Sequence, residues 1–124
     1  MPKHHSPKFL AIVEDAKSRI REICASELRK KIEGEGGFAL IDVREANEYA
    51  AGHLPGAQHL CKGILERDIE SAVPDADTEI VLYCGGGFRS ALAADNLQKM
   101  GYARVLSLAG GWREWTEASL PIEK

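Results

Sequence analysis

The sequence has no long hydrophobic run. Its longest early apolar stretch covers residues 9–13, which is far short of the roughly 20 residues that cross a bilayer. The stretch is also shorter than the apolar core of a signal peptide. We therefore expect a cytoplasmic protein that does not bind a membrane.

Cysteine is scarce, because only Cys24, Cys61 and Cys84 are present. An odd number of thiols cannot all pair, and none of the three lies in the CxxC spacing of a zinc site or a dithiol redox motif. We therefore expect neither structural disulfides nor a bound metal. The remaining question is whether one of the thiols is chemically special.

An excess of positive charge is also lacking. Lys and Arg number 16 against 19 Asp and Glu, which gives a formal net charge of -3. Domains that bind nucleic acids usually carry a basic patch or stripe. The charge balance therefore predicts no nucleic-acid partner.

The chain is short but has an ordinary composition. Its 124 residues fit one domain and leave little room for a second core, which excludes a two-domain enzyme with a cleft between halves. With 44% hydrophobic and 28% charged residues, the chain can bury a core without disulfides, so intrinsic disorder is not expected.

Helical and strand patterns alternate along the chain. Helical spacing or composition predicts helices over residues 7–18, 24–33, 45–51, 64–71, 91–100 and 112–118. Short apolar runs predict strands over residues 38–41, 57–60, 79–83 and 104–108. Such alternation is typical of an α/β fold with a mainly parallel sheet and helices on both sides.

The segment over residues 83–90 is the best candidate for a functional site. In parallel α/β sheets, ligands bind beyond the carboxyl ends of the strands, where loops lead into helix N-termini. Here the strand over residues 79–83 leads directly into a thiol, a run of glycines and the start of a helix. The residues in order are Cys84, Gly85, Gly86, Gly87, Phe88, Arg89 and Ser90.

Each part of this segment has a chemical purpose. Consecutive glycines let backbone N–H groups turn toward one point, because glycine adopts backbone angles closed to other residues. Such donors, together with a helix N-terminus, stabilise an anion, and the thiolate is the nucleophilic form of cysteine. We therefore predict that Cys84 is a nucleophile; the alternative is an ordinary buried cysteine followed by a tight turn.

The segment resembles the active-site loop of the single-domain rhodanese-like sulfurtransferases, with four residues between Cys84 and Arg89. Further segments that resemble family signatures are residues 42–44, 48–49, 52–57, 62–66 and 110–112. The resemblance runs from about residue 20 to residue 115. It predicts an extra N-terminal helical extension over residues 1–19 and a rhodanese-like domain over residues 20–124.

The resemblance implies a five-stranded parallel sheet flanked by helices, and an enzyme that moves sulfane sulfur. Cys84 would take sulfur from a small donor such as thiosulfate and become a persulfide. The sulfur would then pass to a thiophilic acceptor such as cyanide or a thiol, or to a sulfur-accepting protein. Neither a metal nor an organic cofactor is expected.

Several polar residues have an expected role as well. Arg89 is expected to lock the loop and to contact an anionic donor. Asp42 and Arg44 are expected to support the site by hydrogen bonds near the loop, with direct catalysis as the less favoured alternative. We expect His53 to satisfy backbone groups in its turn rather than act as a base. Cys61 is expected to be a small, half-buried residue rather than a resolving thiol.

Two further pairs of residues are not expected to take part in catalysis. His4 and His5 occur in a polar N-terminal stretch and are expected to be solvated. Trp112 and Trp115 lie three residues apart on the last predicted helix and are expected to pack in the core.

The cysteine loop and the expected fold are also compatible with other functions. The same fold hosts cell-cycle phosphatases and arsenate reductases, but their loop has five residues between cysteine and arginine, and a tetrahedral oxyanion needs that wider ring. A non-catalytic sulfur carrier or binding module is the other alternative, although such modules often lose the cysteine. A glycine after the cysteine is also similar to mercaptopyruvate sulfurtransferases, which usually have two domains, so thiosulfate or a persulfide is the favoured donor.

Overall fold

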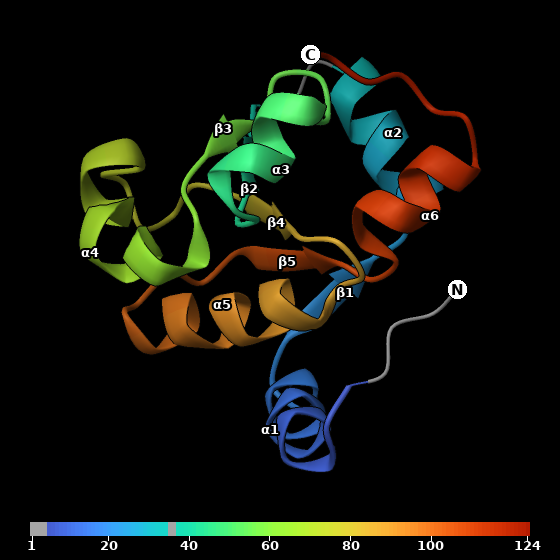
Figure 1. The fold of residues 1–124 in the computed structure, drawn as a ribbon. Helices are drawn as coiled ribbons and strands as arrows, with labels where there is room; N and C mark the ends of the chain where they lie inside the picture. The colour runs from blue at the N-terminus through green and yellow to red at the C-terminus, as the bar shows by residue number, and fades with distance from the viewer. Residues whose placement is uncertain (1–4, 35–36) are drawn as a thin grey trace.

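A computed structural model describes residues 5–34 and 37–124 of the chain. Their strands form one parallel sheet in the order β1-β5-β4-β2-β3. The strands are β1 (Arg21–Ile23), β2 (Ala39–Asp42), β3 (Gln58–His59), β4 (Ile80–Tyr83) and β5 (Val105–Leu108). Because β4 is the central strand, the residue that follows it lies in the middle of the sheet's carboxyl edge (Figure 1).

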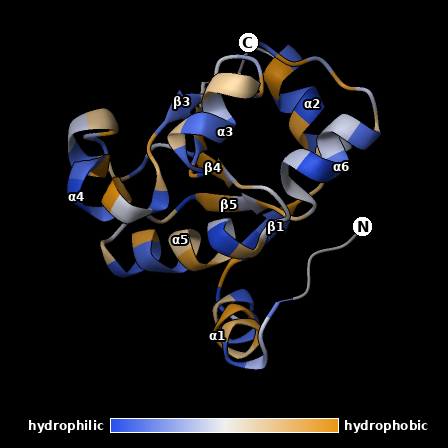
Figure 2. Ribbon diagram, viewed as in Figure 1, coloured by the Kyte–Doolittle hydropathy of each residue, from blue (hydrophilic) through white to orange (hydrophobic). Residues whose placement is uncertain are grey.

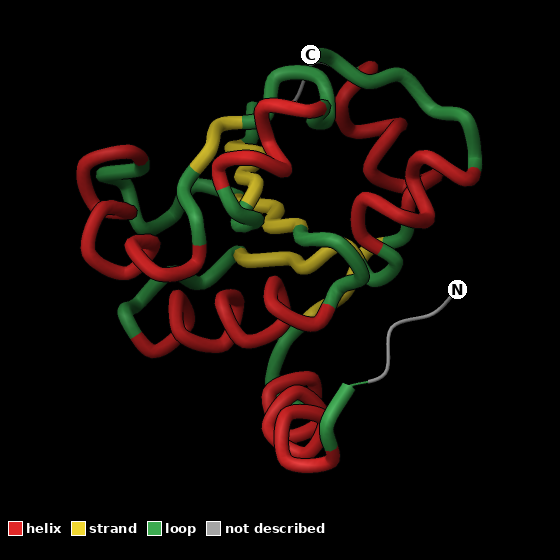
Figure 3. The backbone as a smooth tube through the Cα atoms, in the orientation of Figure 1, coloured by secondary structure: helices red, strands yellow, loops and turns green. Residues whose placement is uncertain are grey.

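Helices cover both faces of this sheet. They are α1 (Pro7–Lys17), α2 (Ala25–Glu33), α3 (Ala46–Ala51), α4 (Lys62–Ala72), α5 (Phe88–Lys99) and α6 (Gly111–Glu117). Helices α4 and α5 lie on one side of the sheet, and α2, α3 and α6 lie on the other (Figure 3). Among the helices of the described residues, none has the length and apolarity that a membrane crossing requires.

The sheet separates two hydrophobic cores, because successive side chains of a strand point to opposite faces. In β4, Ile80 and Leu82 pack into the core under α4 and α5, whereas Val81 and Tyr83 pack into the core under α2 and α6. All four side chains are fully buried. Figure 2 accordingly shows hydrophobic residues along β4 and β5. The strand that leads to Cys84 is therefore held from both sides.

The predicted α/β class and the five-stranded parallel sheet are confirmed. Most helices and strands lie within a few residues of their predicted ranges, but the strand pattern did not predict β1. Arg21 and Glu22 are exposed and only Ile23 is buried, so this strand has no apolar run. It exists because it pairs with β5 along the sheet edge, from Arg21 opposite Leu106 to Ile23 opposite Leu108.

The N-terminal helix α1 is attached to α5. Val13 and Ala16 bury one face of α1. Arg19, just after the helix, donates from Nε and Nη2 to the carboxylate of Asp95 in α5, at 3.0 and 2.8 Å. These hydrogen bonds lower the pKa of Asp95, whose side chain is only 8% exposed. The pair therefore ties α1 to the helix that begins at the glycine loop.

Candidate active site

The sulfur of Cys84 is surrounded by donors from the start of α5. Cys84 follows β4 directly and is only 1% exposed. Its Sγ accepts hydrogen bonds from the backbone N–H groups of Gly87 at 3.1 Å and Ser90 at 3.4 Å. Gly87 is the N-cap of α5 and Ser90 lies in its first turn. The positive end of the helix thus faces the sulfur and favours negative charge there.

Two buried hydroxyl groups continue this network. The Cys84 Sγ lies 3.6 Å from Ser90 Oγ, which in turn lies 2.8 Å from Ser107 Oγ in β5. Both serines are fully buried. Because a hydroxyl hydrogen can rotate, Ser90 can donate to a negatively charged sulfur while Ser107 donates to Ser90. Ser107 was not among the predicted site residues, although a polar residue inside a buried strand was a usable signal.

Two glycines with positive φ shape the loop. Gly87 has φ +93°, and a side-chain carbon at this position would overlap the carbonyl group of Ala109. Gly111 has φ +58°, and a Cβ there would lie 2.6 Å from the carbonyl oxygen of Cys84. Residues other than glycine rarely adopt such angles. The close approach of the loop to the segment between β5 and α6 therefore requires glycine on both sides.

The first turn of α6 also holds the backbone of the loop. The N–H of Trp112 donates to the Cys84 carbonyl at 2.8 Å, and the N–H of Arg113 donates to the Gly85 carbonyl at 3.0 Å. Helix N-termini have N–H groups without a partner inside the helix. Here those groups bind the outward-facing carbonyls of the loop, which leaves the inward-facing N–H groups of the loop for the sulfur.

Arg89 forms an ion pair with Glu48 of α3. Its Nη1 lies 3.1 Å from Oε1, and its Nη2 lies 3.4 Å from Oε2. Burial alone would lower the pKa of Arg89, but the hydrogen bond to Glu48 and the nearby Cys84 sulfur raise it above its usual value. Burial likewise acts to raise the pKa of Glu48, but the hydrogen bonds from Arg89 and the Glu45 N–H, together with the positive charges of Arg89 and Arg44, lower that pKa below its usual value. Glu48 was quoted in the family signature but was not predicted as a site residue.

Asp42 and Arg44 form a buried ion pair at the end of β2. Asp42 is fully buried and Arg44 is 3% exposed. Arg44 Nε lies 3.0 Å from both carboxylate oxygens, and Nη2 donates to Asp42 Oδ2 at 2.7 Å and to the Gly52 carbonyl at 2.6 Å. The guanidinium also lies 4.5 Å from the ring centroid of Trp112. The pair therefore reaches the loop through Trp112, whose N–H binds the Cys84 carbonyl.

The histidines lie in different surroundings. His53 Nδ1 lies 3.2 Å from the Tyr49 carbonyl oxygen, and its ring stacks on Tyr49. His5, which was expected to be solvated, is instead partly buried with its ring centroid 4.4 Å from that of Phe88. His4 lies outside the described residues. Within the part of the chain that the structure describes, no three His, Cys, Asp or Glu side chains gather as a metal site.

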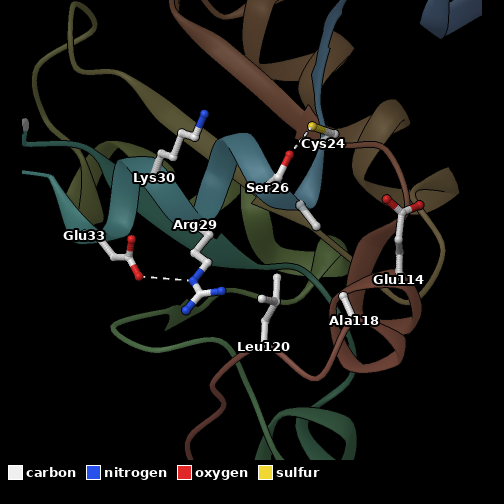
Figure 4. Close-up of a pocket in the computed structure, with 9 residues that line it drawn as sticks. Cys24, Ser26, Arg29, Lys30, Glu33, Glu114, Ala118 and Leu120 are labelled. Atoms are coloured by element: carbon white, nitrogen blue, oxygen red, sulfur yellow. Dashed lines mark hydrogen bonds and ion pairs between the residues drawn. The ribbon is translucent and has the colours of Figure 1, made fainter.

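A pocket lies away from the loop, between α2 and α6 (Figure 4). It has a volume of about 620 Å³ and contains Cys24, whose Sγ lies 3.2 Å from Ser26 Oγ. No residue of the segment 84–90 lines it. Cys61, the third thiol, is partly buried at the N-cap of α4. Cys84 is thus the thiol that the inward N–H groups surround.

A parallel α/β sheet with a cysteine loop at the carboxyl end of its central strand defines a class of small domains. The model of one such family, the rhodanese-like domain, matches residues 25–118. Because the match covers well over half of the chain, the protein belongs to the rhodanese-like domain family.

The matches with individual relatives span different shares of those proteins. Thiosulfate sulfurtransferase GlpE of Pseudomonas putida is 38% identical over 99 residues, which are 80% of this chain and 84% of GlpE. YrkF of Bacillus subtilis, named as a candidate sulfur carrier protein, is 32% identical over 80% of this chain, but the match spans only about half (52%) of YrkF. A solved structure from Rhodopseudomonas palustris, RPA3614, has a TM-score of 0.84 and 30% identity over 99% of both chains; it is described as a protein of unknown function and possible tyrosine phosphatase.

Proposed function

We propose that this protein is a rhodanese sulfurtransferase that carries sulfur as a persulfide on Cys84. The observation that carries the proposal is the sulfur of Cys84 facing the N–H groups of Gly87 and Ser90 at the start of α5. The names of GlpE, a thiosulfate sulfurtransferase, and of YrkF add support for sulfur chemistry. The proposed location is the cytoplasm.

Two half-reactions account for the transfer. The Cys84 thiolate attacks the outer sulfur of thiosulfate, the sulfur–sulfur bond of the donor breaks, and sulfite leaves with the electron pair. Cyanide or a thiolate then attacks the terminal sulfur, and the bond between this sulfur and the Cys84 sulfur breaks. The Cys84 thiolate is the leaving group, and the other product is thiocyanate or the persulfide of the acceptor. Negative charge stays on sulfur throughout, so fixed N–H donors aimed at that position stabilise each stage. The two steps balance without a metal or an organic cofactor.

The remaining residues of the site have supporting roles in this proposal. Gly85 and Gly86 leave room above Cys84 for the transferred sulfur, and Phe88 begins the helix that supplies the donors. Arg89 holds the loop through Glu48 and offers its guanidinium to an anionic donor. Asp42 and Arg44 fix the end of β2 and support Trp112.

Phosphate transfer is a second candidate function, because the similar structure RPA3614 is described as a possible tyrosine phosphatase. The loop argues against it here. Four residues separate Cys84 from Arg89, one fewer than in the phosphatases of this fold, and a tetrahedral oxyanion needs the wider ring. A protein that only carries sulfur to a partner is the nearer alternative, and it would form the same persulfide.

A panel of donors and acceptors tests the proposed function. Thiosulfate, mercaptopyruvate and glutathione persulfide serve as donors, cyanide and glutathione as acceptors, and p-nitrophenyl phosphate as the phosphatase substrate. We expect thiocyanate from thiosulfate and cyanide with ping-pong kinetics, and no release of nitrophenol. Hydrolysis of the phosphate ester without turnover of any sulfur donor would replace this proposal with the phosphatase function.

Replacing Arg89 with lysine is expected to lower turnover by about tenfold or more, although the charge is retained. The guanidinium binds both carboxylate oxygens of Glu48, and an ammonium group cannot reproduce that fork. Steady-state thiocyanate release measures the loss. As a control, Glu48→Gln keeps Arg89 and should be less damaging; full activity of Arg89→Lys would show that charge alone suffices.

A further inference from the structure

Two side chains flank the glycines in front of Cys84. A Cβ at Gly86 would lie 3.4 Å from the ring of Phe88, and a Cβ at Gly85 would lie 3.1 Å from Nη2 of Arg89. The Phe88 ring therefore lies against one glycine and the Arg89 guanidinium beside the other. Cys84, which directly precedes these glycines, is 1% exposed. Both side chains thus lie beside the glycine loop that follows the buried sulfur.

Each of the two side chains is held by a different segment of the chain. Arg89 is held by Glu48 of α3. Phe88 is held from the N-terminal side: its ring centroid lies 4.4 Å from that of His5 and 6.2 Å from that of Phe9, and the Nζ of Lys17 lies 5.4 Å from it. His5 and Phe9 also contact each other, with their centroids 5.3 Å apart.

Helix α1 lies next to the first turns of α5 (Figure 1). It also precedes residues 25–118, the part of the chain that matches the family model. The contact with Phe88 is therefore made by a segment outside the matched domain. A boundary between an extension over residues 1–19 and a domain over residues 20–124 stays a prediction, and it does not separate this helix from the loop.

We propose that Phe9 is a positioning residue for the active-site loop. Together with His5 it holds the Phe88 ring against Gly86, and this limits access to Cys84 to small reactants. A tilted aromatic contact has a preferred geometry, so the neighbouring rings limit rotation of Phe88. Without the Phe9 ring, Phe88 can swing away from Gly86 and widen the approach. The proposal rests on the proposed function only where it names the reactants, which would be small sulfur donors and acceptors rather than bulky thiols.

Loss of the Phe9 ring does not remove the other attachments of α1. Val13 and Ala16 are buried, and Arg19 remains bound to Asp95. Phe9→Ala therefore tests the ring contact without releasing the helix. Ile12, which is 54% exposed on α1, provides a matched control, and Phe9→Tyr keeps an aromatic ring at the same position.

The experiment compares alkylation of Cys84 by a small reagent, iodoacetamide, and a bulky one, N-benzylmaleimide, with each cysteine peptide quantified by mass spectrometry. Phe9→Ala should raise the ratio of bulky to small labelling at Cys84 by about threefold to tenfold. Ile12→Ala and Phe9→Tyr should keep the wild-type ratio. Cys24 and Cys61 should keep their ratios in every variant, because neither lies in the loop.

The outcomes separate this proposal from the proposed function. Labelling needs no sulfur transfer, so the size ratio tests Phe9 even if the protein transfers no sulfur. An unchanged ratio, or an equal rise for both reagents as in general loosening, would overturn the positioning role. In the activity assay, Phe9→Ala should lower the KM for a bulky thiol acceptor relative to the KM for cyanide; an equal change in both KM values would also overturn it.

Discussion

Cys84→Ser should reduce thiocyanate release to the uncatalysed background while the protein stays folded. A serine hydroxyl fits the space of the thiol and can use the same N–H donors, but it is far less ionised and does not form a persulfide. Thiocyanate release measures the activity, and circular dichroism with urea denaturation measures the fold. Loss of activity together with a normal unfolding transition is the expected result.

The other two cysteines provide controls for this result. Cys24 lies in the pocket between α2 and α6, and Cys61 lies at the start of α4. Cys24→Ser and Cys61→Ser should each retain most of the activity. If Cys84→Ser remains active and one of these variants does not, the nucleophile has been assigned to the wrong thiol.

Gly87→Ala is expected to cause the largest loss of stability among single changes in the loop. The backbone at Gly87 has φ +93°, and the new Cβ would meet the Ala109 carbonyl. The left-handed backbone alone costs about 1–3 kcal/mol in a residue with a side chain, and the overlap with backbone adds to it. The free energy of unfolding, from urea denaturation, should therefore fall by about 3 kcal/mol or more.

Gly86→Ala is the matched control for this change. The φ of Gly86 lies outside the left-handed region, and its added Cβ would meet only the Phe88 side chain, at 3.4 Å, which is an ordinary van der Waals distance. Its free energy of unfolding should stay within about 1 kcal/mol of wild type, as for most changes without strain or burial. Equal losses in the two variants would contradict the role assigned to the Gly87 backbone.

Local signals were sufficient to predict most of the fold. The apolar run over residues 79–83 and the glycines after it mark a buried strand and a turn, whatever surrounds them. Strand β1 lacked such a signal, because Arg21 and Glu22 face solvent. Its pairing with β5 is decided by the rest of the sheet rather than by its own residues.

The candidate site was predictable only where it is continuous in sequence. The run from Cys84 to Ser90 carries its own signals, namely a thiol, glycines and a helix start. Glu48 and Ser107 reach this loop from α3 and β5. His5 was predicted to be solvated because its neighbours in sequence are polar, yet it packs on Phe88. The contacts of Glu48 and His5 with distant elements leave no local pattern, which explains these two omissions; Ser107 could have been found as a polar residue inside a buried strand.

If Cys84 carries the transferred sulfur, the mass of the Cys84 peptide will show it. After incubation of the protein with thiosulfate, this peptide should gain the mass of one sulfur atom, and the Cys24 and Cys61 peptides should not. Cyanide should then remove the added mass and release an equal amount of thiocyanate. If the Cys84 peptide gains no sulfur from thiosulfate, mercaptopyruvate or glutathione persulfide, Cys84 does not carry sulfur and the protein is not a sulfurtransferase of this kind.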